Sequence, residues 1–239
     1  MAKYIVYIYS FINIVLEKIW FKLDYIWWHR YKWIKDFGIK NLIDVWANKG
    51  QTISKYKKIR NNKLNIYSFE PLTSAFGILT SKYWSDPKIK LHKMWLGAKQ
   101  EELKINIYSH DDSSSILNAA KDGKDIYHYQ IDNTETIQVE TLDHVFEKWI
   151  DGLCMMKVDV QWYELNVLKW WEKFIKENVK VLILELSFLE LYQWQELFDD
   201  IYMWLRDKWF VYCGALEQAG NPSDGKPLQQ DAYFVNTNL

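Results

Sequence analysis

Short hydrophobic runs alternate with amphipathic stretches along most of the chain. The runs predict strands at residues 41–45, 64–70, 89–97, 153–160, 179–187, 209–215 and 231–237. Helices are predicted between them, after Gly50 and over residues 71–84, 163–178 and 195–208. Pro71 directly follows Glu70 and suits a first helical turn, where a missing N–H costs nothing. This alternation is typical of an α/β domain with a mostly parallel sheet and helices on both faces.

Two segments depart from the simple alternation. Residues 104–109 and 137–143 look like extra strands on either side of a polar segment, which is long for a connection and is therefore functional or mobile. The second departure is AGNPSDGKP, residues 219–227, which reads as a loop between the last two strands. A tight return at this loop makes the last strand antiparallel to the others.

The first part of the chain is aromatic and apolar but carries polar residues such as Glu17 and Lys18. Because no run of 18 apolar residues occurs, we predict no membrane-spanning helix, and no small-residue cleavage site is seen. Residues 1–37 are predicted to form one or two helices, which pack on the domain edge or, alternatively, lie on a membrane surface. Residues 38–239 form the predicted main domain.

Charge and cysteine content narrow the function classes. Thirty basic and 31 acidic residues give a net charge of -1, so no global field favours nucleic acid or an anionic membrane. A small neutral or mixed-charge ligand fits better. Cys154 and Cys213 both lie in apolar runs, which predicts buried reduced thiols and a cytoplasmic setting. No spacing of His, Cys or acidic residues is typical of a metal site.

Chemistry is expected at the carboxyl ends of the strands, where doubly wound sheets bind their ligands. Glu70 follows Gly50 by twenty positions, the usual spacing of an acid that accepts hydrogen bonds from ribose hydroxyls. Capping of the helix at Pro71 is the alternative role. Asp159, which ends another strand, could instead cap the helix that begins near Tyr163.

Seven motifs, taken in order, resemble the FkbM family of S-adenosylmethionine-dependent methyltransferases. They are LIDVWANKGQ, YSFEPLTSAF, DDSSSIL, TLDHVF, MKVDVQWYELNVLKW, LILELSFLELY and DAYFV, and they span roughly residues 38–236. The resemblance implies a Rossmann-like class I methyltransferase fold, with a seven-stranded, mostly parallel sheet whose last strand is antiparallel. It also implies methylation of a hydroxyl on a sugar, glycan or small metabolite.

The resemblance implies S-adenosylmethionine as the cofactor. The expected cofactor-binding residues are Asp44, Trp46, Ala47, Asn48, Gly50, Glu70, Pro71, Leu96, Gly97, Ser114, Ser115 and Asp159. If the turn is really DVGANKG, with glycine in place of Trp46, the backbone N–H groups that follow Asp44 are expected to face the methionine moiety. Asp159 is the first candidate for the general base or acceptor-orienting group, and Glu164 and Glu185 are further catalytic candidates.

Three neighbouring residues have structural alternatives. Ser113 to Ser115 could form a structured loop in place of a ligand contact. Asp143 is predicted to be the N-cap of a helix carrying residues 145–149. Lys157 is expected to pair with an acid.

Tryptophan stands where the family pattern has glycine. The positions are Trp46, Trp162, Trp170, Trp194 and Trp209, and the chain has 14 Trp but only nine Gly. Turns and helix caps at such positions favour glycine. UGA specifies Trp in one genetic code and Gly in another, so we hypothesise that these residues are glycines translated with the wrong code. Real tryptophans would instead fill the cofactor pocket.

Two other functions stay open at this stage. A non-catalytic binding protein of the same fold is expected if the tryptophans are real and occlude the pocket. A dinucleotide oxidoreductase would share the sheet and the ribose acid, but it should carry GxGxxG after the first strand, and GANKG does not provide this motif even with Trp46 replaced by Gly.

Overall fold

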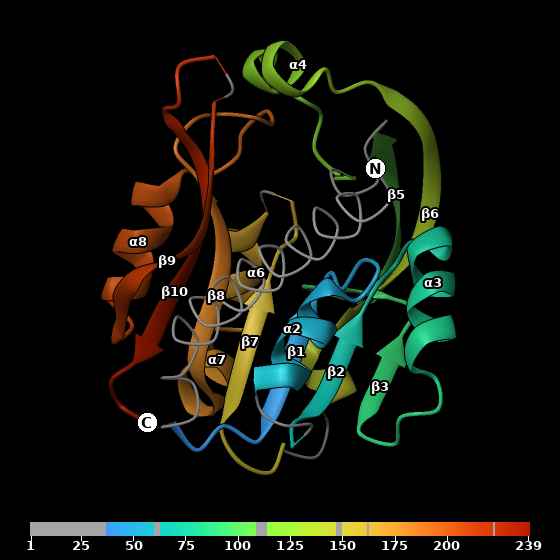
Figure 1. The fold of residues 1–239 in the computed structure, drawn as a ribbon, viewed down its shortest axis with the longest axis vertical. Coiled ribbons are helices and arrows are strands. Elements are labelled where there is room, and N and C mark those ends of the chain that lie inside the picture. The colour runs from blue at the N-terminus through green and yellow to red at the C-terminus, as the bar shows by residue number, and fades with distance from the viewer. Residues whose placement is uncertain (1–36, 60–62, 109–113, 147–149, 162, 222) are drawn as a thin grey trace, which may run out of the picture. The chain divides into compact units, whose positions relative to one another are not determined.

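The computed structural model describes residues 37–59, 63–108, 114–146, 150–161, 163–221 and 223–239 (Figure 1). The chain divides into two compact units, Met1–Gly38 and Ile39–Leu239. The predicted N-terminal helices lie outside the described residues, so the division into a segment 1–37 and a domain 38–239 stays a prediction. Within the described part, no helix is both long and apolar enough to cross a membrane.

A seven-stranded sheet forms the centre of the domain, in the order β3-β2-β1-β7-β8-β10-β9. Its strands are β1 (Asn41–Val45), β2 (Asn65–Phe69), β3 (Ile89–His92), β7 (Cys154–Val158), β8 (Val179–Ser187), β9 (Phe210–Gly220) and β10 (Pro227–Asn236). β10 runs antiparallel to both of its neighbours, and the other pairs are parallel. The predicted antiparallel last strand is therefore confirmed.

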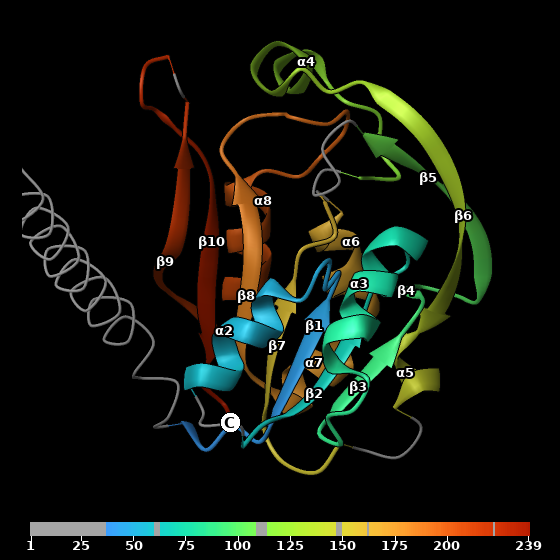
Figure 2. The same cartoon turned by 45° about the vertical axis from the view of Figure 1, so that its right-hand side comes forward.

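Helices cover both faces of this sheet (Figure 2). On one face lie α2 (Gln51–Ile59) and α3 (Thr73–Tyr83), and on the other lie α6 (Glu164–Trp170), α7 (Glu172–Asn178) and α8 (Phe198–Arg206). The chain builds outward from β1 through β2 and β3, then returns to β7 and builds in the opposite direction. The strand order thus reverses between β1 and β7, where ligands bind in such folds.

A smaller sheet extends past the carboxyl ends of the central strands (Figure 1). It contains β4 (Trp95–Gly97), β6 (Ile131–Thr141) and β5 (Glu101–Tyr108) in that order, and α4 (Lys121–Tyr127) connects β5 to β6. The single strand predicted at residues 89–97 is wrong, because β3 pairs with β2 whereas β4 pairs with β6. The chain leaves one sheet for the other between them.

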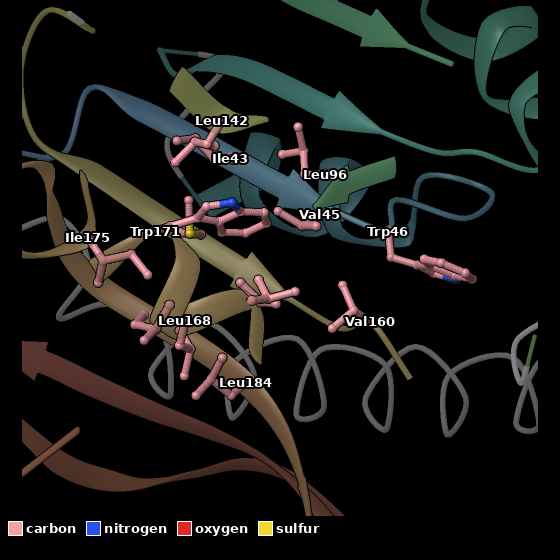
Figure 3. Packing of buried hydrophobic residues seen from close by; sticks show 14 of the residues in the cluster. Ile43, Val45, Trp46, Leu96, Leu142, Val160, Leu168, Trp171, Ile175 and Leu184 are labelled. Atoms are coloured by element: carbon pink, nitrogen blue, oxygen red, sulfur yellow. The ribbon is translucent and has the colours of Figure 1, made fainter. Parts of the chain in front are cut away.

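Two predicted helices differ in the structure. The helix predicted over 163–178 is divided into α6 and α7 by Trp171, whose ring is buried in the core and whose backbone is not helical (φ -105°, ψ 17°) (Figure 3). The predicted N-cap at Asp143 is also wrong. Thr141 caps α5 (Leu142–Val145), because its hydroxyl accepts a hydrogen bond from the His144 N–H and Asp143 already lies inside the helix.

The burial of core residues and of the two cysteines depends on the position of their strands in the sheet. All five residues of β1 are buried, as expected for a central strand with helices on both faces. Cys154 in β7 is buried, but Cys213 in β9 is exposed, which corrects the prediction that both thiols are buried. β9 is an edge strand, so alternate side chains face solvent. Both thiols are free.

Candidate functional site

Asp44 is a buried acid near the end of β1, beside the point where the strand order reverses. Its side chain is fully buried, and within the described part of the chain neither carboxylate oxygen makes a hydrogen bond of standard geometry. Burial raises the pKa of Asp44 to about 7, even though the nearby Lys157 and the Thr52 side chain lower it in part. A buried carboxylate without such hydrogen bonds is costly, so this position suits a ligand that donates hydrogen bonds.

The turn after β1 directs its amides inward. The N–H groups of Trp46 and Ala47 donate to the Phe69 carbonyl over 3.0 and 2.8 Å, and the Asn48 N–H donates to Glu70 Oε2 over 2.8 Å. With tryptophan at position 46, these N–H groups therefore bind protein acceptors, and the expectation that they face a ligand when glycine stands there stays a prediction. The contacts with protein acceptors form because the end of β2 lies directly beside the turn.

Gly50 ends this turn in a conformation that requires glycine. Its φ is +85°, and a Cβ atom added there would lie 2.6 Å from the ring of Tyr83 in α3. The backbone here is therefore left-handed and in close contact with a neighbouring helix.

Glu70 joins the turn to the start of α3. Its Oε1 accepts from the Leu72 N–H over 2.8 Å, and its Oε2 accepts from Asn48. Burial raises the pKa of Glu70 to about 7, although the two backbone donors lower it in part. The contact with Leu72, the N-cap residue of α3, is the helix-end role considered above. Each carboxylate oxygen retains a second lone pair for a ligand hydroxyl.

The buried Pro71 lies between these contacts, two residues before α3 begins at Thr73, so it does not occupy the first helical turn.

A chain of aromatic rings crosses this edge of the sheet. The ring centroids of Trp46 and Trp95 are 6.2 Å apart, those of Trp95 and Tyr163 are 6.3 Å apart, and those of Tyr163 and Trp170 are 5.5 Å apart. Figure 3 shows the Trp46 side chain beyond the end of β1, next to Val45. The Trp46 ring is thus placed where the sequence predicts the cofactor turn.

Leu96 and Gly97, at the end of β4, are buried beside these rings. A Cβ atom added at Gly97 would lie 2.5 Å from a methyl group of Val139 and 3.9 Å from the ring of Trp170.

Three of the tryptophans at expected glycine positions have left-handed backbone. The φ angles are +72° at Trp46, +66° at Trp194 and +65° at Trp209. L-residues other than Gly, Asn and Asp rarely adopt this region. Trp170 differs, since it is the last residue of α6, and Trp162 lies outside the described residues.

Lys157, Asp159 and Asp231 form a charged network beside Asp44. Lys157 Nζ lies 2.6 Å from Asp159 Oδ2 and 4.0 Å from Asp231 Oδ1, which confirms the expected pairing of Lys157 with an acid. Burial opposes the charge of Lys157, but the carboxylates of Asp159, Asp231 and Glu185 raise its pKa well above the ordinary value. Lys157 therefore remains positively charged.

Glu185 lies on the same face of the sheet, paired in register with Asp231. Gln229 Nε2 donates to its Oε1 over 2.7 Å, and Gln161 Nε2 donates to its Oε2 over 3.3 Å. Burial, followed by the charge of Asp159, raises the pKa of Glu185 well above its ordinary value. Glu185 is therefore a stronger base than an ordinary carboxylate.

A pocket of about 260 Å³ opens beside Glu185 and Asp231. It is lined by acids and amides together with one alanine, namely Glu185, Glu217, Gln218, Ala219, Gln229, Gln230 and Asp231. Hydrogen-bond acceptors dominate this lining, which suits a ligand rich in hydroxyl or other donor groups. Among the described residues, no group of three or more His, Cys, Asp or Glu is arranged to hold a metal ion.

The remaining candidates hold the chain together near this pocket. Glu164, the first residue of α6, accepts from the Val160 N–H over 2.9 Å. Ser114 and Ser115 are buried, and the Ser115 hydroxyl donates to the Gln161 carbonyl over 2.9 Å. The sequence analysis missed Gln161. Its position in the loop directly after Asp159 is the signal that could have indicated it.

The family model described as "Methyltransferase FkbM domain" matches residues 44–212, more than half of the chain. Among curated proteins, none matched.

Solved structures show the fold. The methyltransferase FkbM of Methylobacillus flagellatus KT is 14% identical with a TM-score of 0.50, over 82% of this chain and 44% of that chain. The fibrillarin of Aeropyrum pernix, solved with natively bound S-adenosyl-L-methionine, is 11% identical with a TM-score of 0.45, over 83% of this chain and 66% of that chain. The likeness to the first structure confirms the predicted Rossmann-like methyltransferase fold. This chain spans less than half the length of that protein.

Proposed function

Because the chain belongs to the FkbM methyltransferase domain family, we propose that it transfers a methyl group from S-adenosylmethionine to a hydroxyl of a sugar, glycan or small metabolite. The observation that carries this proposal is the placement of Asp44, Glu70 and Glu185. All three are acids with raised pKa values at the carboxyl ends of sheet strands, and all lie within the matched residues.

The polar groups at the ends of β1 and β2 fit the cofactor. Neither oxygen of Asp44 makes a hydrogen bond of standard geometry among the described residues, and both would accept hydrogen bonds from the cofactor's polar groups. Glu70, at the end of the adjacent strand, would accept from its ribose hydroxyls. When bound, S-adenosylmethionine supplies an electrophilic methyl group. The remaining cofactor-binding residues predicted from the sequence stay predictions.

The acid- and amide-lined pocket is the proposed acceptor site. Its carboxylates and amide oxygens accept hydrogen bonds from hydroxyl groups, which favours a hydroxyl-rich acceptor. We assign the general base to Glu185, because it lines this pocket and its raised pKa makes it a stronger base than an ordinary carboxylate. Asp159, fixed by Lys157, would orient the acceptor. Glu164 is already bound to the Val160 N–H and serves to hold the loop.

Trp46 favours one alternative, a binding protein of the same fold without catalytic activity. Only 6% of Trp46 is exposed, and its ring packs on Trp95 at the expected cofactor turn. In this alternative the ring occupies the space that a cofactor would need. A cytoplasmic location, the absence of a nucleic-acid partner and peripheral membrane contact through residues 1–37 stay predictions.

Calorimetric titration with S-adenosylmethionine separates the two functions. The methyltransferase proposal expects saturable binding that weakens in Asp44→Asn and Glu70→Gln, followed by transfer of labelled methyl groups to a panel of sugars and hydroxylated metabolites. Asp122→Asn, an exposed acid in the first turn of α4, is the control and should bind as the unchanged protein does. Absence of binding in both the unchanged protein and Trp46→Gly would contradict the proposal.

A further inference from the structure

Gln161 holds an uncommon backbone conformation for its residue type. Its φ is +54°, and the side chain is almost completely buried in the loop after β7. A buried left-handed residue other than glycine persists only when its surroundings determine it strongly. The contacts of Gln161 show what holds it there.

The side-chain amide of Gln161 bridges two carboxylates. Its Nε2 donates to Asp159 Oδ1 over 2.8 Å and to Glu185 Oε2 over 3.3 Å. An amide NH2 group carries two hydrogens, so it can serve two acceptors at once. The other oxygens of these carboxylates accept from Lys157 and Gln229. Each of the four carboxylate oxygens therefore has one donor, and Gln161 supplies two of the four.

The backbone of Gln161 binds a third segment. Its carbonyl accepts from the Ser115 hydroxyl over 2.9 Å, and that hydroxyl in turn accepts from the Leu117 N–H over 3.1 Å. Ser115 also pairs with Asn106 of β5 through the backbone. One residue thus links the loop after β7, the acid on β8 and the segment that follows β5.

The Gln161 amide is a neutral hydrogen-bond donor between Asp159 and Glu185, in a region where charged groups surround Glu185. The charged and titratable groups near it come from several elements and are Lys157, Asp159, Asp231, Glu164, Tyr127 and Tyr192. The carboxylates of Asp159, directly after β7, and of Glu185 in β8 repel each other when both are ionised, and an N–H donor to both reduces this repulsion and fixes their orientation.

We propose that Gln161 is a positioning residue, which links the Asp159 carboxylate to that of Glu185, fixes Glu185 in the lining of the acceptor pocket and ties both acids to the Ser115 segment. This inference rests on the proposed function, because the pocket is the proposed acceptor site. Gln161 itself takes no part in proton transfer.

Gln161→Gly tests this role, because glycine keeps the left-handed backbone without strain but removes the amide. The matched control is His128→Gly. His128 also has a left-handed backbone (φ +55°), but its side chain is exposed at the end of α4. Both variants should fold, and thermal unfolding checks this.

The first readout is the titration of Glu185, which is monitored by ¹³C NMR of labelled carboxylates. Loss of a donor to a carboxylate disfavours its charged form. The Glu185 titration should therefore move to higher pH in Gln161→Gly and stay unchanged in His128→Gly. Identical titrations in Gln161→Gly and the unchanged protein overturn the proposal.

The second readout is kcat with the acceptor found in the methyl-transfer screen. We expect a loss of roughly tenfold to a hundredfold in Gln161→Gly, with the acidic limb of the kcat profile moved to higher pH and cofactor affinity unchanged. An unchanged kcat and pH profile in an active enzyme also overturns the proposal. A shifted Glu185 titration in a protein without methyl transfer supports the positioning role and refutes the proposed function alone.

Discussion

The indole rings of Trp46 and Trp95 meet edge to face at the end of β1, with their centroids 6.2 Å apart and their planes at 86°. Trp46 makes this contact while its backbone is left-handed, with a φ of +72°. An aromatic pair contributes about 0.5–1.5 kcal/mol beyond the burial of its surface. A left-handed residue with a Cβ atom costs roughly 1–2 kcal/mol. Ring packing therefore offsets the strain at this turn.

Trp46→Gly should separate ring packing from cofactor access. Because the ring is buried, its loss should lower the free energy of unfolding by about 1–3 kcal/mol, despite the relief of backbone strain. The affinity for S-adenosylmethionine should rise about tenfold or more, since the ring leaves the cofactor turn. Calorimetry measures the affinity, and urea denaturation measures the stability.

Trp46→Ala is the control, because it removes the ring but keeps the strained backbone. It should also bind the cofactor more tightly and be less stable than Trp46→Gly. Equal affinity in the two variants and the unchanged protein would show that the ring does not obstruct binding.

Trp194→Gly should instead stabilise the protein. Trp194 is 89% exposed, so little buried surface is lost, while its φ of +66° is favourable only for glycine. We expect an increase of about 0.5–1 kcal/mol in the free energy of unfolding. Trp194→Ala removes the same ring without relieving φ and should show no such increase. Equal stability of the Gly and Ala variants would argue against backbone strain at this position.

The left-handed backbone also makes the genetic-code hypothesis specific to three positions. Trp46, Trp194 and Trp209 need glycine conformations, whereas Trp171 is buried in the core with negative φ and is well accommodated as tryptophan. We predict UGA codons at positions 46, 194 and 209, and UGG at position 171. Gene sequencing reads the codons, and peptide mass spectrometry of the protein from its natural source identifies the residues. UGG at the three positions would refute the hypothesis.

Stability should fall as the pH rises because Asp44 is buried. Its pKa is raised from 3.8 to about 7 in the folded protein. Between these values the folded protein holds a proton that the unfolded chain releases. The stability contributed by this group is therefore fully present below about pH 4 and is lost as the pH rises through about 7.

Asp44→Asn removes this titration while keeping the shape of the side chain. The difference in unfolding free energy between the variant and the unchanged protein should favour the variant increasingly from about pH 4 to about pH 7. Urea denaturation at several pH values measures it, with Asp122→Asn as an exposed control. A difference that does not change with pH would show that Asp44 does not titrate in this range.

Many strands of the central sheet could be predicted from the local pattern of apolar and polar residues. The strand prediction at 179–187 matches β8 at both ends, because a long, mostly apolar run that starts after Asn178 suits a central buried strand. The run at 89–97 also contains apolar residues at most positions, but its division between two sheets depends on partners far away in the sequence. The division of the predicted helix at Trp171 could not be predicted either, since a helical pattern does not show which side chain is buried in the core at the expense of helical backbone.

In the candidate site, too, some residues could be predicted from the sequence and others could not. Asp44, Glu70 and Glu185 could be found because acids at strand ends interrupt apolar runs. Gln161 could not, because its importance lies in bridging carboxylates that are 2 and 24 positions away. Local sequence also does not show that two amides of the turn with Trp46 bind the Phe69 carbonyl, which belongs to the next strand. Which groups contact one another in the site is therefore determined by contacts between distant strands, and local sequence does not reveal these contacts.

Gly97 provides a test of the packing beneath the aromatic rings. A Cβ atom there would lie 2.5 Å from a methyl group of Val139 on the paired strand β6, so Gly97→Ala should force β4 and β6 apart. We expect a loss of about 1–3 kcal/mol in the free energy of unfolding, measured by urea denaturation. Gly77→Ala is the matched control, because Gly77 lies inside α3 and an added Cβ there meets no atom within 4 Å. That variant should gain up to about 1 kcal/mol from the helix propensity of alanine. Similar effects of the two substitutions would contradict the close packing of β4 against β6.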